Sequence, residues 1–368
     1  MIPRLYEKAA SSTVSIAGPM ICPLDELTVC KVTEERNGEY YLEAEYPLDA
    51  RNIGQLMVDR MVYSKPNRAD DPDWFRISKL QRSLTGTVKI TAYHNSYDLK
   101  GFVLEPMTAT YTTAADALNA LKWLAKPQYV IGGRYTFYSD TSTITTTIPA
   151  LAHYPHTFRE IMGGIAGSIL DIYGGEWKYE QSKIYLKSAR GKDSGKRIIY
   201  GANMVGLNQE ISTIDSAYQV LPYYAQDEDN VIIGSIEANG NSSYIPPFAY
   251  TKIVDITQDW NNINGETPPA NAADISGFVA PRIGRYTKDP ETAIDAEYIE
   301  LSDSAEYSFL NDGSLGLCDL VTVIHPASGL NLKAKVVKTT YNALTGRYDQ
   351  IVIGTIKKDL IDLLRRIK

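Results

Sequence analysis

The chain has 368 residues, more than one ordinary compact domain holds, so we expect about two to four domains. Hydrophobic residues make up 44% and charged residues 22%, which is the balance of a soluble globular protein. The 44 acidic residues outnumber the 37 basic ones and give a formal net charge of -7. A nucleic-acid-binding surface needs a basic surplus, so this balance argues against sequence-specific nucleic-acid binding.

Sorting signals and disulfide bonds are not predicted either. Residues 1–6 are not followed by a long apolar run with a cleavage site, so a signal peptide is not expected. No stretch approaches the roughly 20 apolar residues that span a bilayer, so we expect no transmembrane segment. The three cysteines, Cys22, Cys30 and Cys318, fit packing roles in a reducing cytoplasm better than a disulfide framework.

Residues 1–107 have the pattern of short strands joined by tight turns. Residues 40–46 alternate apolar with polar or acidic side chains, as a half-buried strand does, and Asn37-Gly38 before them is a hairpin signal. Further on, Leu84-Thr85-Gly86 separates two more strand-like runs. Several short strands with turns between them predict a small β-barrel or sandwich.

Residues 108–196 show helical spacing instead. Thr113-x-x-Asp116 is a capping box that opens a helix ending before Pro127. A second capping box, Thr157-x-x-Glu160, predicts one continuous helix up to Gly174-Gly175, with the Gly163-Gly164-x-x-Gly167 cluster packed inside it.

A hairpin is predicted directly after this second helix. Trp177 and Tyr179 alternate with charged residues and are expected to pair across a short turn with Ile184 and Leu186. Helices and a hairpin together predict an α+β module of about 90 residues.

Strand patterns return after residue 197 and are interrupted by a polar stretch rich in Pro and Asn, which predicts an insertion. A second Leu-Thr-Gly turn, Leu344-Thr345-Gly346, echoes the first and raises the possibility of a duplicated barrel. Residues 357–368 are amphipathic, with basic residues at their end that suit the helix dipole, so they predict a C-terminal helix.

A search for metal-binding chemistry yields no site. His153 and His156 are close in sequence, but Pro155 lies between them and no third ligand is evident, so we interpret them as loop residues. His94 and His325 belong to no motif. Asp227-Glu228-Asp229 lacks the spaced ligands and glycine of a calcium loop and predicts a solvated loop.

Catalytic motifs are not predicted either. Asp193-Ser194-Gly195 is similar to the aspartic-protease tripeptide, but its basic flanks indicate a solvated turn, whereas that chemistry needs a buried apolar setting. No nucleophile elbow, Walker A or H-E-x-x-H sequence is present. Asn241-Ser242-Ser243 matches a glycosylation sequon, which has no meaning without a secretory route. We therefore predict no catalytic, cofactor-binding or metal-binding residue.

An ordered series of short segments resembles one protein family. The segments, from the N-terminus to the centre of the chain, are Ile2–Tyr6, Glu34–Tyr40 with Tyr46-Pro47, Trp74–Ile77, Ala92–Leu99, Gly174–Trp177, Arg190–Gly195, Tyr200–Leu207 and Leu221–Tyr224. Each segment is weak alone, but their order resembles the prophage tail endopeptidase family, tail-associated hub proteins of phages of Gram-positive bacteria. Ala202-Asn203 departs from that family, where Lys-Asn is usual.

This resemblance implies an α+β, mainly β fold with two tandem hub-type antiparallel β-barrels. An α+β domain would separate the barrels, and an inserted domain would interrupt the second. The implied ranges are 1–107 for the first barrel, 108–196 for the α+β domain, 197–245 with 318–356 for the second barrel, 246–317 for the inserted domain and 357–368 for the C-terminal helix.

The resemblance also implies a function. Made in the cytoplasm of the bacterial host, the chain would form a homotrimeric ring at the virion tail tip or baseplate. Its implied partners are the distal tail protein, the tail tube, the tape-measure protein and a receptor-binding or lytic protein. We expect no enzymatic activity and no cofactor, because no catalytic constellation was found and the chain has no room for a lytic domain after its second barrel. The alternatives are a tail-associated peptidoglycan endopeptidase, which a converging His, Asp or Cys cluster would favour, and a receptor-binding adhesin.

Overall fold

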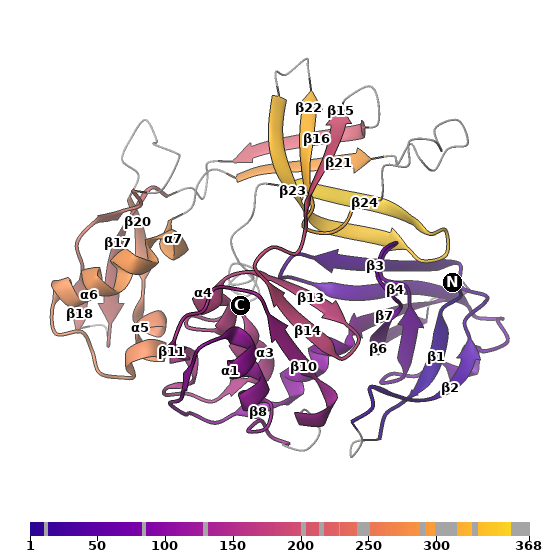
Figure 1. Ribbon diagram of the computed structural model, residues 1–368, viewed down its shortest axis with the longest axis horizontal. Helices are drawn as coiled ribbons and strands as arrows, with labels where there is room; N and C mark the ends of the chain where they lie inside the picture. The colour runs from indigo at the N-terminus through magenta and orange to yellow at the C-terminus, as the bar shows by residue number, and fades with distance from the viewer. Residues whose placement is uncertain are drawn as a thin grey trace.

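The computed structural model describes eleven segments of the chain, and the rest of the text concerns these residues (Figure 1). They are 1–10, 14–82, 86–127, 132–199, 204–212, 217–227, 229–240, 251–287, 291–298, 315–325 and 330–354. Within them the structure is mainly β, with short helices, which confirms the mainly β part of the predicted fold class.

The first β unit contains seven strands and two short 3-10 helices. The strands are β1 (Arg4–Lys8), β2 (Ala17–Pro23), β3 (Val29–Glu35), β4 (Tyr40–Pro47), β5 (Met61–Ser64), β6 (Asp73–Arg82) and β7 (Thr87–His94), and the 3-10 helices are η1 (Ile53–Gln55) and η2 (Asn95–Gly101). All neighbours are antiparallel, in the order β3-β4-β7-β6-β5-β1-β2. The hairpin predicted at Asn37-Gly38 is confirmed, because Asn37 has a positive φ of 54° between the paired strands β3 and β4.

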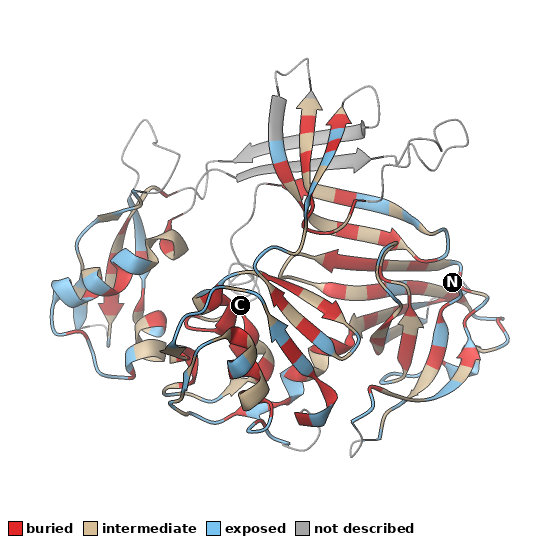
Figure 2. Ribbon diagram, viewed as in Figure 1, coloured by how far each residue is buried: buried red, intermediate tan, exposed pale blue. Residues whose placement is uncertain are grey.

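Strand β4 shows why the alternation of apolar and polar residues correctly predicted a half-buried strand in this segment. Tyr40, Leu42, Ala44 and Tyr46 are all buried, while the residues between them are exposed or intermediate. One face of the sheet therefore forms the core of this unit, as the alternating red and lighter bands along the strands show (Figure 2).

The α+β unit follows the first β unit in sequence. Its strands are β8 (Val103–Leu104), β9 (Thr110–Tyr111), β10 (Thr136–Ser139), β11 (Thr146–Thr147), β12 (His156–Thr157), β13 (Glu176–Glu180) and β14 (Lys183–Lys187), and its helices are α1 (Ala114–Leu121), η3 (Pro149–Leu151), α3 (Phe158–Met162) and α4 (Ile169–Tyr173). The predicted hairpin register is confirmed, since Trp177 pairs with Leu186 and Tyr179 with Ile184.

Both predicted helix starts in this unit are confirmed, but the second helix is not continuous. Thr113 accepts a hydrogen bond from the amide of Asp116, and Thr157 and Glu160 form a complete capping box. The helix then ends at Met162 and a new one begins at Ile169. Gly164 and Gly167, with φ of 112° and 73°, adopt left-handed conformations that break the helix, so the glycine cluster is a helix terminator and not a packed helix interior.

The second β unit is assembled from distant parts of the sequence. Its strands are β15 (Asp193–Ile199), β16 (Met204–Ser212), β21 (Glu291–Tyr298), β22 (Leu320–His325), β23 (Leu330–Asn342) and β24 (Arg347–Gly354). Strand β15 pairs with β22 in parallel, and the other neighbours are antiparallel. Gly346 connects β23 to β24 with φ of 74°, and Gly86 precedes β7 with φ of 85°, so both echoed glycines have positive φ between paired antiparallel strands; Leu84 and Thr85 lie outside the described residues.

Strand β23 joins the two β units into one sheet. Its first half pairs with β22, and its second half lies between β24 and β3 of the first unit. Among the described residues this produces a sheet of 13 strands whose pairing runs from β16 to β2 without closing on itself. The structure thus shows two β units that share a sheet, and the closed barrels that the resemblance implied are not seen in the described pairing.

A small two-layer unit lies between β16 and β21 in sequence. Its sheet contains β17 (Gln219–Ala225), β18 (Val231–Ile233), β19 (Glu237–Ala238) and β20 (Thr251–Asp255), and its helices are α5 (Thr257–Asn264), α6 (Ala272–Val279), η4 (Ala280–Arg282) and α7 (Ile283–Tyr286). It has its own hydrophobic core. The range 197–245 implied for the second barrel includes β17 to β19. The structure places these three strands in one sheet with β20, where β17 pairs with each of the other three.

The predicted C-terminal helix, residues 357–368, lies outside the described residues.

Candidate functional site

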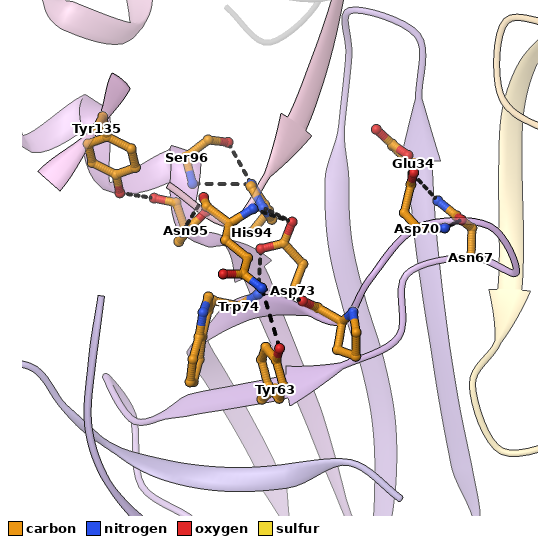
Figure 3. A network of polar contacts seen from close by, with 12 residues as sticks. Glu34, Tyr63, Asn67, Asp70, Asp73, Trp74, His94, Asn95, Ser96 and Tyr135 are labelled. Carbon is orange, nitrogen blue, oxygen red and sulfur yellow. Dashed lines mark hydrogen bonds and ion pairs between the residues drawn. The ribbon is translucent and has the colours of Figure 1, made fainter. Parts of the chain in front are cut away.

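Buried polar side chains gather where the units meet, and one such cluster contains the only histidine of the first β unit. His94 ends β7 and is fully buried, with its ring stacked on Tyr40 at 4.3 Å between centroids. The backbone N–H of Ser96 donates to Nδ1 of His94 (3.2 Å), which assigns the ring hydrogen to Nε2. Nε2 lies 3.2 Å from Oδ2 of Asp73, within ion-pair distance but not aligned as a hydrogen bond (Figure 3).

The same cluster fastens the α+β unit to the first β unit. Asp73 accepts a hydrogen bond from the backbone N–H of Gln181, in the turn between β13 and β14 (2.9 Å). Asn95 donates from its side chain to the carbonyl of Gln181 (2.9 Å), and the hydroxyl of Tyr135 donates to the carbonyl of Asn95 (2.9 Å). The two units are therefore joined by hydrogen bonds from buried residues of both.

Asp73, His94 and Ser96 are arranged in the order of a catalytic triad. Nδ1 of His94 is 3.0 Å from Oγ of Ser96, and Asp73 is on the other side of the ring. A triad needs its serine oxygen beside a bound substrate. Here Ser96 and His94 have no exposed surface, and Nη1 of Arg159 donates to the serine oxygen (3.2 Å). The arrangement therefore supports a structural function for these three residues.

A second cluster joins the first β unit, the α+β unit and the second β unit around a buried ion pair. Arg190, just before β15, places its two terminal nitrogens 2.6 and 3.0 Å from the two carboxylate oxygens of Glu34 in β3. Their side chains are only 7% and 6% exposed. Arg190 also donates to the carbonyl of Trp177 in β13 (3.1 Å). A bidentate ion pair that is shielded from water is strong, and its planar geometry fixes the relative orientation of the two side chains.

Glu176, at the start of β13, is the centre of the same cluster. Its carboxylate accepts from Arg36 (2.8 Å), from Lys335 of β23 (2.6 Å) and from the backbone N–H of Arg190 (2.8 Å). Burial by itself raises the pKa of the Glu176 carboxyl, but these donors outweigh burial and hold the pKa below its usual value. Glu176 is thus an anion in the α+β unit that binds donors from the first and the second β unit.

Backbone contacts complete this junction. Asn37 donates to the carbonyl of Gly175 and accepts from the amide of Trp177 (2.9 and 2.8 Å). Gly191 approaches the second β unit so closely that a Cβ atom there would lie 2.0 Å from the carbonyl oxygen of Cys318. Only glycine fits that position.

The residues of this junction were quoted for the family resemblance, but sequence reasoning gave none of them a partner. Cys30, Val32 and Glu34 are alternate, buried positions of β3, so Glu34 places a charge where an apolar side chain is expected. That departure could have marked Glu34 as a residue with a buried partner. Its partner is 156 residues away. No local pattern identifies such a partner.

The structure does not bring the two loop histidines together with a third ligand. His156 pairs in β12 with Leu104, and its Nδ1 lies 3.7 Å from Glu160. The neighbouring His156 and the hydrogen bonds from Thr157 lower the pKa of Glu160 to about 2, against the effect of burial. His153 lies beside Gly265 of the inserted unit. Within the described ranges, no group of three or more potential metal ligands occurs.

The other candidate motifs have structural contacts. Asp193-Ser194-Gly195 forms the start of strand β15 and not the predicted turn; Asp193 is exposed, forms an ion pair with Lys333 (2.6 Å) and accepts from the amide of Gly195 (3.1 Å). Asp227 closes the turn between β17 and β18 by accepting from the amides of Asp229 and Asn230. Glu228, residues 241–243 and the side chain of His325 lie outside what the structure describes.

The three cysteines are free and buried. Burial raises the pKa of Cys30 and of Cys318 to about 12, and it raises the pKa of Cys22 as well. Their thiols are therefore protonated at neutral pH and are poor nucleophiles. In the part of the chain that the structure covers, no helix is long and apolar enough to cross a bilayer.

Comparison with known proteins identifies the fold but no sequence family. No protein-family model matches the chain, and no curated protein sequence matches it. Prophage tail protein gp18 from Listeria monocytogenes EGD-e matches it in structure with a TM-score of 0.61 and 12% identity, over 100% of this chain and 98% of that one. The chain has the fold of a prophage tail protein.

Two further structures share this fold. The tail protein from Neisseria meningitidis MC58 matches with a TM-score of 0.57 and 9% identity, over 96% of this chain and 97% of that one. The 43 kDa tail protein of prophage MuSo2 from Shewanella oneidensis matches with a TM-score of 0.57 and 12% identity, over 97% and 98%. The likeness supports a phage-tail fold, but it does not support the specific endopeptidase family that the sequence resembles.

Proposed function

We propose that this chain is a structural hub subunit of the tail tip or baseplate of a phage, a prophage or a phage-derived tail. The observation that carries the proposal is the fold, which this chain shares over nearly its whole length with proteins described as tail proteins. Fold alone does not determine function, so the proposal also needs a physical basis in the molecule.

Rigidity between the two β units is that basis. Strand β23 belongs to the sheet of both units, and the Glu34–Arg190 and Glu176 clusters fix the α+β unit against them. A subunit that must form a ring of defined diameter needs a fixed angle between its contact surfaces, because heterologous contacts close only at the correct rotation. We propose that the two β units are the two hub-type barrels of such a subunit, and the echoed turns at Gly86 and Gly346 support their common origin.

In this proposal three chains form a ring that closes or extends the tail tube. Both ends of the open strand path, at β2 and β16, would be covered by neighbouring chains, because uncovered strand edges promote uncontrolled pairing. The distal tail protein, the tape-measure protein and a receptor-binding or lytic protein are the proposed neighbours of the ring.

A peptidoglycan endopeptidase is the second candidate, because Asp73, His94 and Ser96 converge in the fold. Complete burial of His94 and Ser96 makes this candidate weaker. Incubation of the purified protein with peptidoglycan tests it. Released muropeptides that disappear in a Ser96→Ala variant would establish the enzyme and refute a purely structural function.

Light scattering combined with electron microscopy tests the hub. We expect a mass of three chains and ring-shaped particles, and we expect the protein to co-purify with the distal end of tails. A stable monomer at high concentration that adds no ring to tails would refute the proposal.

A further inference from the structure

The inserted unit has one covered and one open sheet face. Helices α5 and α6 pack on one face, which contains Val220 and Tyr224. Side chains that alternate with these point to the opposite, open face. The register of β17 with β18 and β20 gives the open face large apolar and aromatic side chains, namely Leu221, Tyr223, Val231, Ile233 and Ile253. Of these, Val231 is 44%, Ile233 56% and Ile253 69% exposed, so an apolar surface is in contact with water.

The open face is acidic at one end. Asp255 is the last residue of β20 and points to the open face beside Tyr223. Asp227 and Asp229 lie in the turn that follows β17, at the same end of the sheet. Within the described ranges, none of these three carboxylates is in an ion pair. Residues 217–287 as a whole contain eight acidic and three basic residues. A partner that is both apolar and basic therefore suits this face.

A segment of the same chain has the matching character. Residues 357–368, which lie outside the described residues, contain five basic and two acidic side chains, a net charge of +3 in a chain whose total is -7. Their sequence also predicts an amphipathic helix, with an apolar stripe at positions i, i+3, i+4 and i+7 formed by Leu360, Leu363, Leu364 and Ile367. A helix of about twelve residues is marginal alone in water, so this stripe needs a surface on which to pack.

The connections of the chain bring this segment close to the inserted unit. Gly354, the last residue of β24, pairs with Ala293 of β21, and β21 begins on the side of the inserted unit (Figure 1). Ala293 is six residues after Thr287 of the inserted unit, so Gly354 lies within about 25 Å of Thr287. Residues 355 and 356 span about 7 Å and a helix over residues 357–368 about 18 Å, so the segment reaches the inserted unit.

We propose that residues 357–368 bind as an amphipathic helix to the open sheet face of the inserted unit in the same chain. Leu363 and Leu364 of the stripe pack on Ile233 and Ile253, and the basic side chains face the acidic end of the sheet. A helix about 18 Å long fits along β17, whose seven residues span about 23 Å. The contact gives the sheet a helical layer on both faces and fastens the inserted unit to the second β unit.

Disulfide crosslinking tests the contact in the full-length chain. Ile253→Cys combined with Leu363→Cys places one thiol on the open face and one in the stripe. The control combines Leu363→Cys with Met57→Cys, because Met57 is a 53% exposed apolar residue of the first β unit. The natural cysteines are buried and do not compete. After mild oxidation we expect on the order of tenfold more disulfide within one chain for the first pair than for the control, measured by mass spectrometry of the linked peptides.

Hydrogen exchange of the amides in residues 357–368 is an independent measurement. We expect these amides of the wild type to exchange on the order of tenfold or more slowly than those of an unprotected chain. Ile253→Asp and Leu363→Asp should each remove this protection, because each places a carboxylate in the apolar contact. Met57→Asp should leave the protection unchanged. Circular dichroism confirms that each variant is folded.

Other results overturn the contact. Disulfide no more abundant than in the control, a disulfide that joins two chains, unprotected amides in the wild type, or unchanged protection in Ile253→Asp would each refute it. The contact lies within one chain and is independent of the hub function, which depends on the trimeric mass and the ring. Failure of one is therefore distinguishable from failure of the other.

Discussion

Individual charged residues of this protein are buried where the units meet. Glu34 lies in β3 and Arg190 lies in the segment just before β15, and both are almost completely removed from water. Burying two charges costs several kcal/mol each, and the bidentate geometry offsets that cost only while both partners are present. Such pairs contribute more to a unique arrangement of the units than to net stability.

Removal of one partner should therefore be severe. Glu34→Gln leaves the Arg190 guanidinium buried beside a neutral amide, and we expect a loss of about 3–5 kcal/mol in the free energy of unfolding. Urea denaturation measures this loss. Glu105→Gln is the control, because Glu105 pairs with Lys126 at the surface, and its effect should stay within about 0.5 kcal/mol. The double variant Glu34→Leu, Arg190→Leu should recover part of the stability; equal losses in the single and double variants would contradict the pairing.

The lowered pKa of Glu176 predicts a dependence of stability on pH. A carboxyl whose folded pKa is below its unfolded pKa stabilises the protein above the unfolded value, and this contribution is lost as the pH falls through the folded pKa. The difference in stability between wild type and Glu176→Gln should thus be largest near pH 7 and should shrink below about pH 4. Urea midpoints between pH 7 and pH 3 measure it. A difference independent of pH would refute the assignment.

Among the elements, glycines decide where helices end and where units come close together. Gly164 and Gly167 divide the segment after Thr157 into α3 and α4, although isoleucines continue at helical spacing through it. Gly191 has a different function, since it lets the chain before β15 lie directly on the backbone at Cys318.

Gly191→Ala should consequently disturb the junction between the α+β unit and the second β unit. The added Cβ meets a backbone carbonyl that cannot rotate away, so we expect a loss of about 3 kcal/mol, at the upper end for overpacking. Thermal unfolding measures the loss. Gly101→Ala, where nothing lies within 4 Å of the added atom, should change the free energy of unfolding by less than about 1 kcal/mol. Equal effects of the two substitutions would contradict the close approach.

For the molecule as a whole, strand β23 makes one sheet of two β units that are far apart in sequence. Residues 338–342 pair with β24 on one side and with β3 on the other. The hydroxyls of Thr33 and Thr340 lie 3.2 Å apart across the β3–β23 contact. The hydrogen bonds of the two units at this contact should accordingly break in one cooperative unfolding event.

A proline at position 340 tests this coupling. Thr340→Pro removes a backbone donor from the middle of the sheet, at a cost of about 3 kcal/mol. Hydrogen exchange of the amides in β3 and β24 should then accelerate by about 100-fold in both strands. Thr340→Val keeps the backbone donor and should leave both rates near those of the wild type. Acceleration in β24 without any change in β3 would contradict a shared opening.

The sequence by itself determined the local elements of this protein. Alternation predicted strand β4, the register of Trp177 with Leu186 followed from the hairpin pattern, and the capping residues Thr113 and Thr157 marked two helix starts. These features depend on residues only a few positions apart, so a local pattern is enough to specify them.

Only the tertiary structure decided which distant residues meet. The contacts of Glu34 with Arg190, of Asp73 with His94 and of β3 with β23 join segments that are 21 to more than 300 residues apart. The inserted sheet likewise takes β17 from a stretch that resembled barrel strands. The alternation of apolar and polar residues in a strand indicates that the strand has a buried face, but it does not indicate which strand is its neighbour. That choice depends on the packing of the whole chain, because the free energy of pairing comes from side chains that the neighbouring strand supplies.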